Sequence, residues 1–149
     1  MTEYPITASN KTRQLREKAV YDREVVHAIL DAGLVAHVAM NQDGDPIVVP
    51  MIYGRSGETI YLHGARKARV VRVLEQTKTA CLNVTLLDAV VLARSAFNSS
   101  MNYRSVTIFG EPRLVDSREE KLLAMKLISE HLMPGRWAEL RDPLEREIK

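Results

Sequence analysis

Three short apolar segments follow one another in this chain with only turns between them. The segments cover residues 34–40, 47–53 and 59–63, and the turns at 41–46 and 54–58 are rich in Gly, Asp and other turn-forming residues. Connections this short join antiparallel strands, because two parallel strands need a much longer crossover. The pattern therefore predicts an antiparallel meander.

Further strands and helices are expected on both sides of the meander. Additional strands are predicted over residues 79–85, 89–96 and 103–115, and helices over 65–76, after Asp22, after Ser117 and after Asp142. Because the strands come in consecutive runs and do not alternate strictly with helices, the pattern favours an α+β fold over a doubly wound fold. The expected architecture is an antiparallel sheet or barrel of about six strands with flanking helices.

Two of the expected helices carry clear boundary signals. Asp22 is a favourable N-cap residue, and Gly33 suits the C-terminal end of the same helix. Ser117 and Glu120 form a capping box, because each side chain can accept or donate at the other residue's backbone. The helix that begins at Ser117 is expected to stop at Pro134.

Length and charge limit the classes of protein to consider. A chain of 149 residues is expected to form one domain, here residues 17–149, preceded by a polar N-terminal arm over residues 1–16. The chain has 21 basic and 19 acidic side chains, a weaker basic bias than nucleic-acid-binding domains usually show. With no apolar run of membrane-spanning length and no signal peptide, a cytoplasmic protein is expected, without nucleic acid or membrane as a partner.

Cysteine and histidine usage argues against a metal site. Cys81 is the only cysteine, which excludes an intrachain disulfide and a zinc ribbon, and its apolar strand favours a buried, inert thiol. His27, His37 and His131 lack the spacing of metal ligands and are expected to have structural roles. No metal is therefore expected.

A basic cluster follows the strand that ends at residue 63. Gly64 is followed by Arg66, Lys67 and Arg69 at the start of the expected helix. The positive end of a helix favours acidic groups, so three cations there make sense if an anion such as a phosphate binds. Arg66 and Arg69 would share one helical face, and Gly64 would let a ligand approach the backbone. The alternative is a solvated basic helix without a ligand.

Two more segments offer polar groups for a site. His63 could donate or accept a proton beside the expected anion site. Arg104 matches planar acceptors and phosphate, and Ser105 could add a neutral hydrogen bond. The alternatives are a histidine without chemistry at a surface or interface, and an interface ion pair of Arg104 with packing by Tyr103.

Three motifs carry a resemblance to a known family. They are residues 61–64 followed by the basic cluster, residues 100–106 with Phe109 and Gly110 after them, and residues 134–137. From about Asp22 onward, the chain resembles the pyridoxamine 5′-phosphate oxidase-related, FMN-binding split-barrel proteins. It is most similar to the branch that includes the nitroimidazole-resistance proteins.

The resemblance implies an antiparallel split β-barrel that works as a homodimer, with FMN, FAD or another flavin in a cleft between the subunits. It implies that residues 50–53 present backbone groups to the flavin ring, that the basic cluster holds the phosphate, and that His63 faces the flavin as the catalytic residue. The cofactor-binding residues implied are Pro50, Met51, Ile52, Tyr53, His63, Gly64, Arg66, Lys67, Arg69, Tyr103, Arg104 and Ser105.

The function implied is that of a flavin-dependent oxidoreductase acting on an unidentified small molecule. The alternatives are a non-catalytic flavin- or haem-binding module, a nitroimidazole-reductase-like resistance protein, and an interaction domain that uses the basic helix. Relatives usually continue into at least one more barrel strand. Two alternatives follow: the sheet is incomplete and lacks a final strand, or the chain is a shortened form. Because the residues that bind the substrate phosphate in pyridoxamine phosphate oxidases have no equivalent here, that reaction is not expected.

Overall fold

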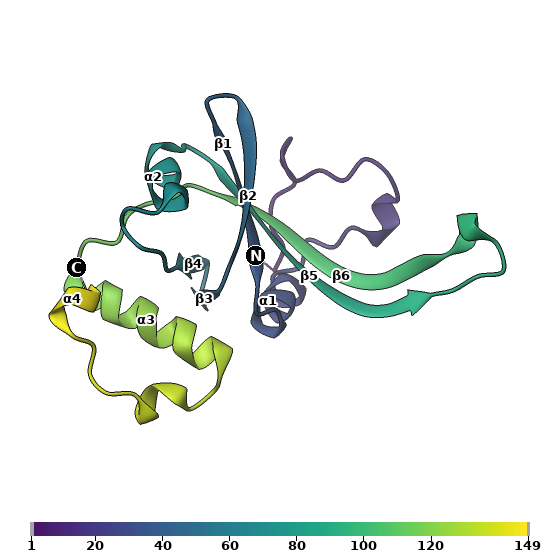
Figure 1. The fold of residues 1–149 in the computed structure, drawn as a ribbon. Helices are drawn as coiled ribbons and strands as arrows, with labels where there is room; N and C mark the ends of the chain where they lie inside the picture. The colour runs from purple at the N-terminus through teal and green to yellow at the C-terminus, as the bar shows by residue number, and fades with distance from the viewer. Residues whose placement is uncertain (1, 149) are drawn as a thin grey trace.

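A computed structural model describes residues 2–148; Met1 and Lys149, the end residues of the predicted arm and domain, lie outside this range. The strands are β1 Ala36–Gln42, β2 Asp45–Met51, β3 Tyr53–Ser56, β4 Thr59–Leu62, β5 Ala80–Val91 and β6 Ser100–Gly110. The helices are α1 Arg23–Ala32, α2 Arg69–Gln76, α3 Arg118–Leu132 and α4 Glu145–Ile148, with short 3₁₀ turns at Arg16–Lys18, Ala96–Asn98 and Arg136–Glu139 (Figure 1).

The six strands form two separate antiparallel sheets. One sheet has the order β2-β1-β5-β6, and the other contains β3 and β4 alone. This arrangement confirms the predicted α+β class and split antiparallel architecture. The helix boundaries at Asp22 and Ser117 are also confirmed, because each side chain accepts a hydrogen bond from the backbone three residues later.

The single strand predicted over residues 47–53 is wrong. It divides at Ile52, so that β2 stays in the larger sheet while β3 enters the smaller one. Tyr53 explains the break, because its side chain is fully buried and its hydroxyl donates to the carbonyl oxygens of Leu30 (2.5 Å) and Gly33 (2.9 Å) at the end of α1. The chain must leave β2 to place Tyr53 there.

The core lies between the larger sheet and helices α1 and α2. Its buried members are Val26, Ile29, Leu30, Ala36, Val38, Met40, Tyr53, Val73, Leu82, Val84 and Val106. Helix α3 packs instead on β3 and β4. The alternation of buried and exposed residues along β1 gives that strand a single core-facing side.

Strands β5 and β6 form a long ribbon that extends beyond the rest of the fold (Figure 1). The two strands predicted over 79–85 and 89–96 are one strand, β5, with a bulge at Asp88. Strand β6 begins at Ser100, three residues earlier than predicted, and ends at Gly110, five residues earlier. Pro112, which lacks a backbone N–H, follows that end closely.

The N-terminal segment returns to the body of the fold before α1 begins. Glu3 and Asp22 form an isolated antiparallel bridge, and the Tyr4 N–H donates to the carbonyl oxygen of Tyr21 at 2.8 Å. The boundary predicted at residue 16 between arm and domain stays a prediction. Over residues 2–148, no helix combines the length and the apolar character needed to cross a bilayer.

Candidate functional site

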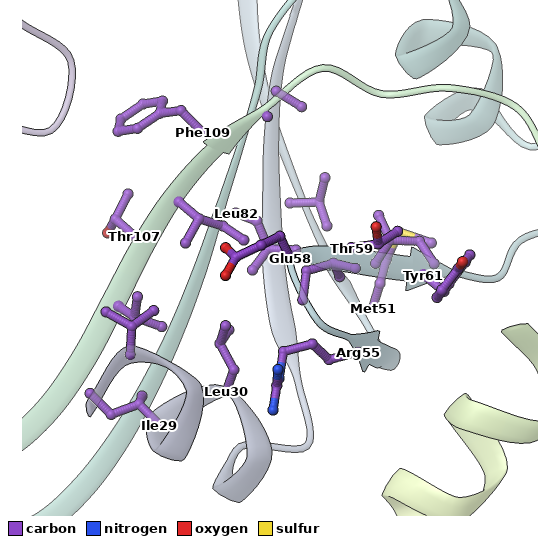
Figure 2. A pocket seen from close by; sticks show the side chains of 18 of the residues that line it. Ile29, Leu30, Met51, Arg55, Glu58, Thr59, Tyr61, Leu82, Thr107 and Phe109 are labelled. Carbon is purple, nitrogen blue, oxygen red and sulfur yellow. The ribbon is translucent and has the colours of Figure 1, made fainter. Parts of the chain in front are cut away.

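One large groove of about 1810 Å³ contains most of the expected site. Its walls come from the N-terminal segment, α1, β4, the outer strand β6 and the start of α3. Figure 2 shows Arg55, Glu58 and Tyr61 among the side chains that line it. Pockets for one small ligand usually measure about 300–1000 Å³. The groove therefore has room for an extended ligand, or for a ligand and a segment of a second chain.

The expected cofactor-binding residues divide into two groups. The residues that line the groove are Met51, His63, Gly64, Arg66, Tyr103, Arg104 and Ser105. The residues outside its lining are Pro50, Ile52, Tyr53, Lys67 and Arg69. The role expected for each of these residues toward a flavin stays a prediction.

The basic cluster does not begin a helix where the sequence pattern places the start. Helix α2 begins at Arg69 rather than at residue 65, and its N-cap is Ala68. Arg66 and Lys67 lie in a turn closed by a 2.7 Å hydrogen bond from the Ala68 N–H to the Ala65 carbonyl. The expectation that Arg66 and Arg69 share a helical face is therefore wrong. The helix dipole supplies a physical reason, because cations at the positive end disfavour extending the helix backward over them.

The start of α2 retains the charge pattern of an anion site. Ala68 provides no side-chain cap, and the first turn contains no acidic residue. Within residues 2–148, the side chains of Arg66 and Lys67 have no ion-pair or hydrogen-bond partner, whereas Arg69 Nε donates to Gln42 Oε1 at 2.7 Å. Free backbone donors beside two unpaired cations form a favourable place for a phosphate.

Gly64 has a packing role that the sequence does not reveal. A Cβ atom at this position would lie 3.0 Å from Val71 Cγ2 and 3.8 Å from Met51 Cε. The first distance is shorter than an ordinary van der Waals contact, so a larger residue would require the Val71 side chain of α2 to shift. Gly64 thus keeps His63, the turn and α2 close together.

Arg104 is held by an acidic residue of its own chain. Its Nη2 lies 2.8 Å from Asp88 Oδ1, and its Nε lies 3.1 Å from Asp88 Oδ2. The hydrogen bonds from Arg104 lower the pKa of the Asp88 carboxyl, so the pair stays charged at neutral pH. Asp88 was not expected from the sequence, because the bulge that places it beside Arg104 depends on the register of β5 with β6.

A second polar cluster lines the groove where the N-terminal segment meets α1 and β4. Glu58 accepts hydrogen bonds from the Tyr4 hydroxyl and from Arg23 Nη1, both at 2.6 Å, and His27 Nε2 lies 3.3 Å from its Oε1. Burial and the hydrogen bond to Glu58 raise the pKa of Tyr4 to about 12. The same hydrogen bond from Tyr4 lowers the pKa of Glu58. Sequence reasoning missed this cluster, since no local pattern links Tyr4 with Glu58.

Two other residues considered in the sequence analysis, His131 and Cys81, have contacts that favour a structural role. His131 Nε2 lies 2.5 Å from the Gly33 carbonyl oxygen, and its ring centroid is 4.8 Å from that of Tyr53. Cys81 is half-buried, and burial raises the pKa of its thiol, which keeps it protonated and unreactive. Within the described residues, no group of His, Cys, Asp and Glu side chains could hold a metal ion.

Comparisons with known proteins found a matching sequence profile and several similar solved structures. The sequence profile described as pyridoxamine 5′-phosphate oxidase matches residues 22–149. The solved structure of the flavocytochrome Anf3 from Azotobacter vinelandii is similar at 37% identity and a TM-score of 0.86, covering 95% of this chain and 66% of that one. A FAD and haem binding protein from Mycobacterium smegmatis is similar at 36% identity and a TM-score of 0.79, covering 85% and 62%.

A third similar structure shares the fold. It is a protein named for 5-nitroimidazole antibiotic resistance from Bacteroides thetaiotaomicron, with 22% identity and a TM-score of 0.72, covering 87% of this chain and 75% of that one. The present chain spans slightly less than two thirds of the length of the first two structures. A comparison with curated proteins found no match.

The sequence profile covers nearly all of the chain, and the solved structures with the same fold include flavin-binding proteins. The motifs that suggested the resemblance lie inside the matched range. On these grounds, the chain belongs to the pyridoxamine 5′-phosphate oxidase family.

Proposed function

We propose that this chain binds a flavin, as FMN or FAD, in the groove beside the start of α2 and acts as a flavin-dependent oxidoreductase. The observation that carries the proposal is Arg66, an unpaired cation in the groove lining, before an uncapped helix. Lys67, the next residue and also unpaired, lies outside the lining and adds a second positive charge there. Family membership and the two flavin-binding structures at 36–37% identity support it.

The residues present fit such a cofactor. Arg66 and Lys67 would hold its phosphate, and Arg104 offers a guanidinium already oriented by Asp88. Met51 and Tyr103 would cover the ring and exclude water. A bound flavin supplies electron or hydride transfer, while the chain supplies orientation and charge. His63 lines the groove and has no hydrogen-bond partner within residues 2–148, so its imidazole is available to hold or move a proton beside a substrate.

The ribbon of β5 and β6 favours a homodimer. Every residue from 87 to 105 is exposed, and the apolar ones are Leu87, Val90, Val91, Leu92, Phe97, Met101 and Tyr103. A two-stranded ribbon is marginally stable alone, and a large exposed apolar surface marks an interaction site. The ribbon also borders the groove, which is larger than one ligand needs. A second copy would cover the ribbon and complete the groove wall.

The absorption spectrum of the purified protein tests flavin binding. We expect a yellow protein, with release of FMN or FAD on denaturation identified by mass. The double variant Arg66→Ala with Lys67→Ala should weaken flavin binding about tenfold, because two charge-assisted contacts are lost. Arg72→Ala with Lys78→Ala removes the same charge outside the groove lining and serves as the control. Equal retention in both double variants would place the phosphate elsewhere.

Turnover tests the role of His63. The His63→Ala variant should bind flavin normally and lose turnover of a small acceptor by tenfold or more, because general acid–base groups contribute at least that much. Undiminished turnover would reject a catalytic role for His63.

Solution mass tests the homodimer. We expect the wild type to be a dimer by light scattering, and Leu92→Ser with Phe97→Ser to shift it toward monomer, because these side chains are 86% and 96% exposed on the ribbon. Ile6→Ser with Met133→Ser changes exposed apolar residues outside the ribbon and should leave the dimer intact. A monomeric wild type would contradict the homodimer.

A second candidate function is haem binding in addition to flavin. It is favoured by the names of the two similar structures, a flavocytochrome and a FAD and haem binding protein. His63 could bind the haem iron, since its imidazole lines the groove without a partner in residues 2–148. A haem absorption band in the protein loaded with added haem, lost in His63→Ala, is the expected result. An unchanged free-haem spectrum would exclude it.

A further inference from the structure

Residues 5–20 form a loop whose two ends are held together. Beside the Glu3–Asp22 bridge, the Arg23 N–H donates to the Thr2 carbonyl oxygen at 2.9 Å. Such a compact surface loop with closed ends is an Ω-loop, a type that is often functional. The loop precedes residue 22, where the family match begins.

Side chains fix the base and the first half of this loop. Tyr4 is held by Glu58, and the Arg23 guanidinium lies 4.2 Å from the centre of its ring. The Tyr21 hydroxyl donates to the Asn10 carbonyl oxygen at 3.0 Å and accepts from the Thr12 N–H at 3.2 Å. The loop therefore has a defined position relative to the groove.

The loop is strongly basic and its charges are unpaired. It contains Lys11, Arg13, Arg16 and Lys18, with Glu17 as its one acidic residue. All four basic side chains are exposed, and none has an ion-pair partner within residues 2–148. Neighbouring like charges repel one another, so an anion bound near them would relieve this repulsion.

The four basic side chains differ in their position relative to the groove. Lys11 and Lys18 line the groove, whereas Arg13 and Arg16 do not. Leu15 and Val20, which are exposed apolar residues, line the groove beside the two lysines. Cations next to apolar side chains suit a phosphate attached to a nucleoside, because the base needs an apolar cover.

The same groove thus holds two separate sets of unpaired cations. In Figure 1 the loop and α2 lie on opposite sides of the β1–β2 hairpin. Arg66 contributes to the groove from the α2 side, and Lys11 and Lys18 contribute from the loop side. FMN carries a single phosphate group, which the first set would neutralise. The second set would suit a second anionic group.

We propose that the loop of residues 5–20 holds the adenylate phosphate of FAD through Lys11 and Lys18, and so selects FAD over FMN. The proposal rests on the flavin function proposed above. Arg66 and Lys67 keep the phosphate on the riboflavin side, and Leu15 and Val20 cover the adenine.

Flavin titration of the full-length apoprotein tests this proposal. Dissociation constants for FMN and FAD are measured by flavin fluorescence at fixed ionic strength, since contacts between exposed charges weaken with salt. We expect the wild type to bind FAD more tightly than FMN. Lys11→Ala with Lys18→Ala should weaken FAD binding about tenfold and change FMN binding less than about twofold. Arg13→Ala with Arg16→Ala removes the same charge from the same loop and should change neither constant more than about twofold.

Limited trypsin digestion gives a readout independent of affinity. Trypsin cleaves after Lys and Arg, so FAD should slow cleavage at Lys11 and Lys18, and FMN should not. Protection that appears only when NADPH is added to the FMN-loaded protein would assign the second phosphate to a separate nucleotide and overturn the selection of FAD.

Other outcomes separate the two proposals. Equal losses for FMN and FAD in the lysine variant, or equal effects of the two double variants, would reduce the loop to a general charge effect and overturn its role. If both flavins bind and the loop variants change neither dissociation constant, the role of the loop is overturned and the proposed flavin function stands. Failure of the wild type to bind either flavin would overturn both.

Discussion

Tyr53 illustrates how one side chain determines the division into two sheets. Its hydroxyl lies within hydrogen-bond distance of two carbonyl oxygens at the end of α1, and its ring contacts His131 of α3. Burial raises the pKa of this phenol to about 12, so it remains a donor at all physiological pH values. The residue expected to face a flavin through its backbone is thus also a central member of the core.

Tyr53→Phe should destabilise the protein by about 1–2 kcal/mol, because the Leu30 carbonyl oxygen loses its hydroxyl donor in a buried place. Urea denaturation followed by circular dichroism measures the loss. Tyr21→Phe removes a hydroxyl from a loop contact that is only partly buried and should cost less than half as much. Equal losses in the two variants would contradict the structural role given to Tyr53.

The cations near the groove differ in whether an acidic side chain of the same chain pairs with them. Asp88 neutralises much of the charge of Arg104, and Glu58 does the same for Arg23. Arg66 and Lys67 lack such a partner within residues 2–148. The contrast separates cations held in place by an acidic side chain of the same chain from cations whose whole charge remains available for a ligand.

Helix α3 depends on a glycine in the strand beneath it. A Cβ on Gly54 would lie 2.7 Å from the Ile128 nitrogen and 2.8 Å from the Leu127 carbonyl carbon. Both distances are to helix backbone, which cannot rotate away. The close packing of α3 on β3 therefore requires glycine at this position.

Gly54→Ala should cost about 2–3 kcal/mol of unfolding free energy, because α3 must move away from β3. The matched control is Gly110→Ala. A Cβ at Gly110 would meet nothing within 4 Å, and the φ angle of Gly110 is not positive. Thermal melts of both variants provide the measurement. A Gly54→Ala melting temperature equal to that of Gly110→Ala would show that α3 is not packed this tightly.

The arrangement of the whole molecule places the groove between elements distant in sequence. The N-terminal loop, β4, β6 and the start of α3 each supply part of its wall. The ribbon of β5 and β6 extends away from this body and leaves its apolar residues uncovered (Figure 1). Ligand binding and dimerisation are therefore expected to depend on each other.

Acid should destabilise the whole molecule through its paired carboxylates. Hydrogen bonds from cations or from tyrosine lower the pKa values of Asp31, Glu58, Asp88, Glu120 and Glu147, in the last case to about 2. A lowered folded-state pKa contributes stability above the ordinary values of 3.8–4.5, and this contribution disappears as the pH falls through the folded-state value.

We expect the melting temperature to be nearly constant from pH 7 to about 5 and to fall steeply between about pH 4 and 2. Differential scanning calorimetry across this range measures the effect. Glu147→Gln removes the group whose pKa is lowered to about 2 and should flatten the fall, whereas Glu24→Gln, which changes a group without a partner within residues 2–148, should not. A melting temperature that rises on acidification would reverse the sign and contradict the assignment.

Much of the fold followed from local patterns in the sequence. Short turns identified the antiparallel meander, and the caps at Asp22 and Ser117 placed the starts of α1 and α3 correctly. These signals are reliable because each depends on residues close together in the sequence, such as a hydrogen bond within three residues or a short turn. The motifs at residues 61–64 and 100–106 pointed to the family to which the chain belongs.

Only the tertiary structure decided the break at Ile52, the bulge at Asp88 and the contact of Tyr4 with Glu58. Each of these features depends on contacts between residues more than a dozen positions apart. No periodic pattern in the local sequence can therefore predict it. The start of α2 was misplaced for a related reason, because the charges of Arg66 and Lys67 act against a helix that their neighbours' apolar spacing favours. Local hydrogen bonding and alternation thus determined the elements, whereas burial of distant side chains determined how the elements divide and what lines the groove.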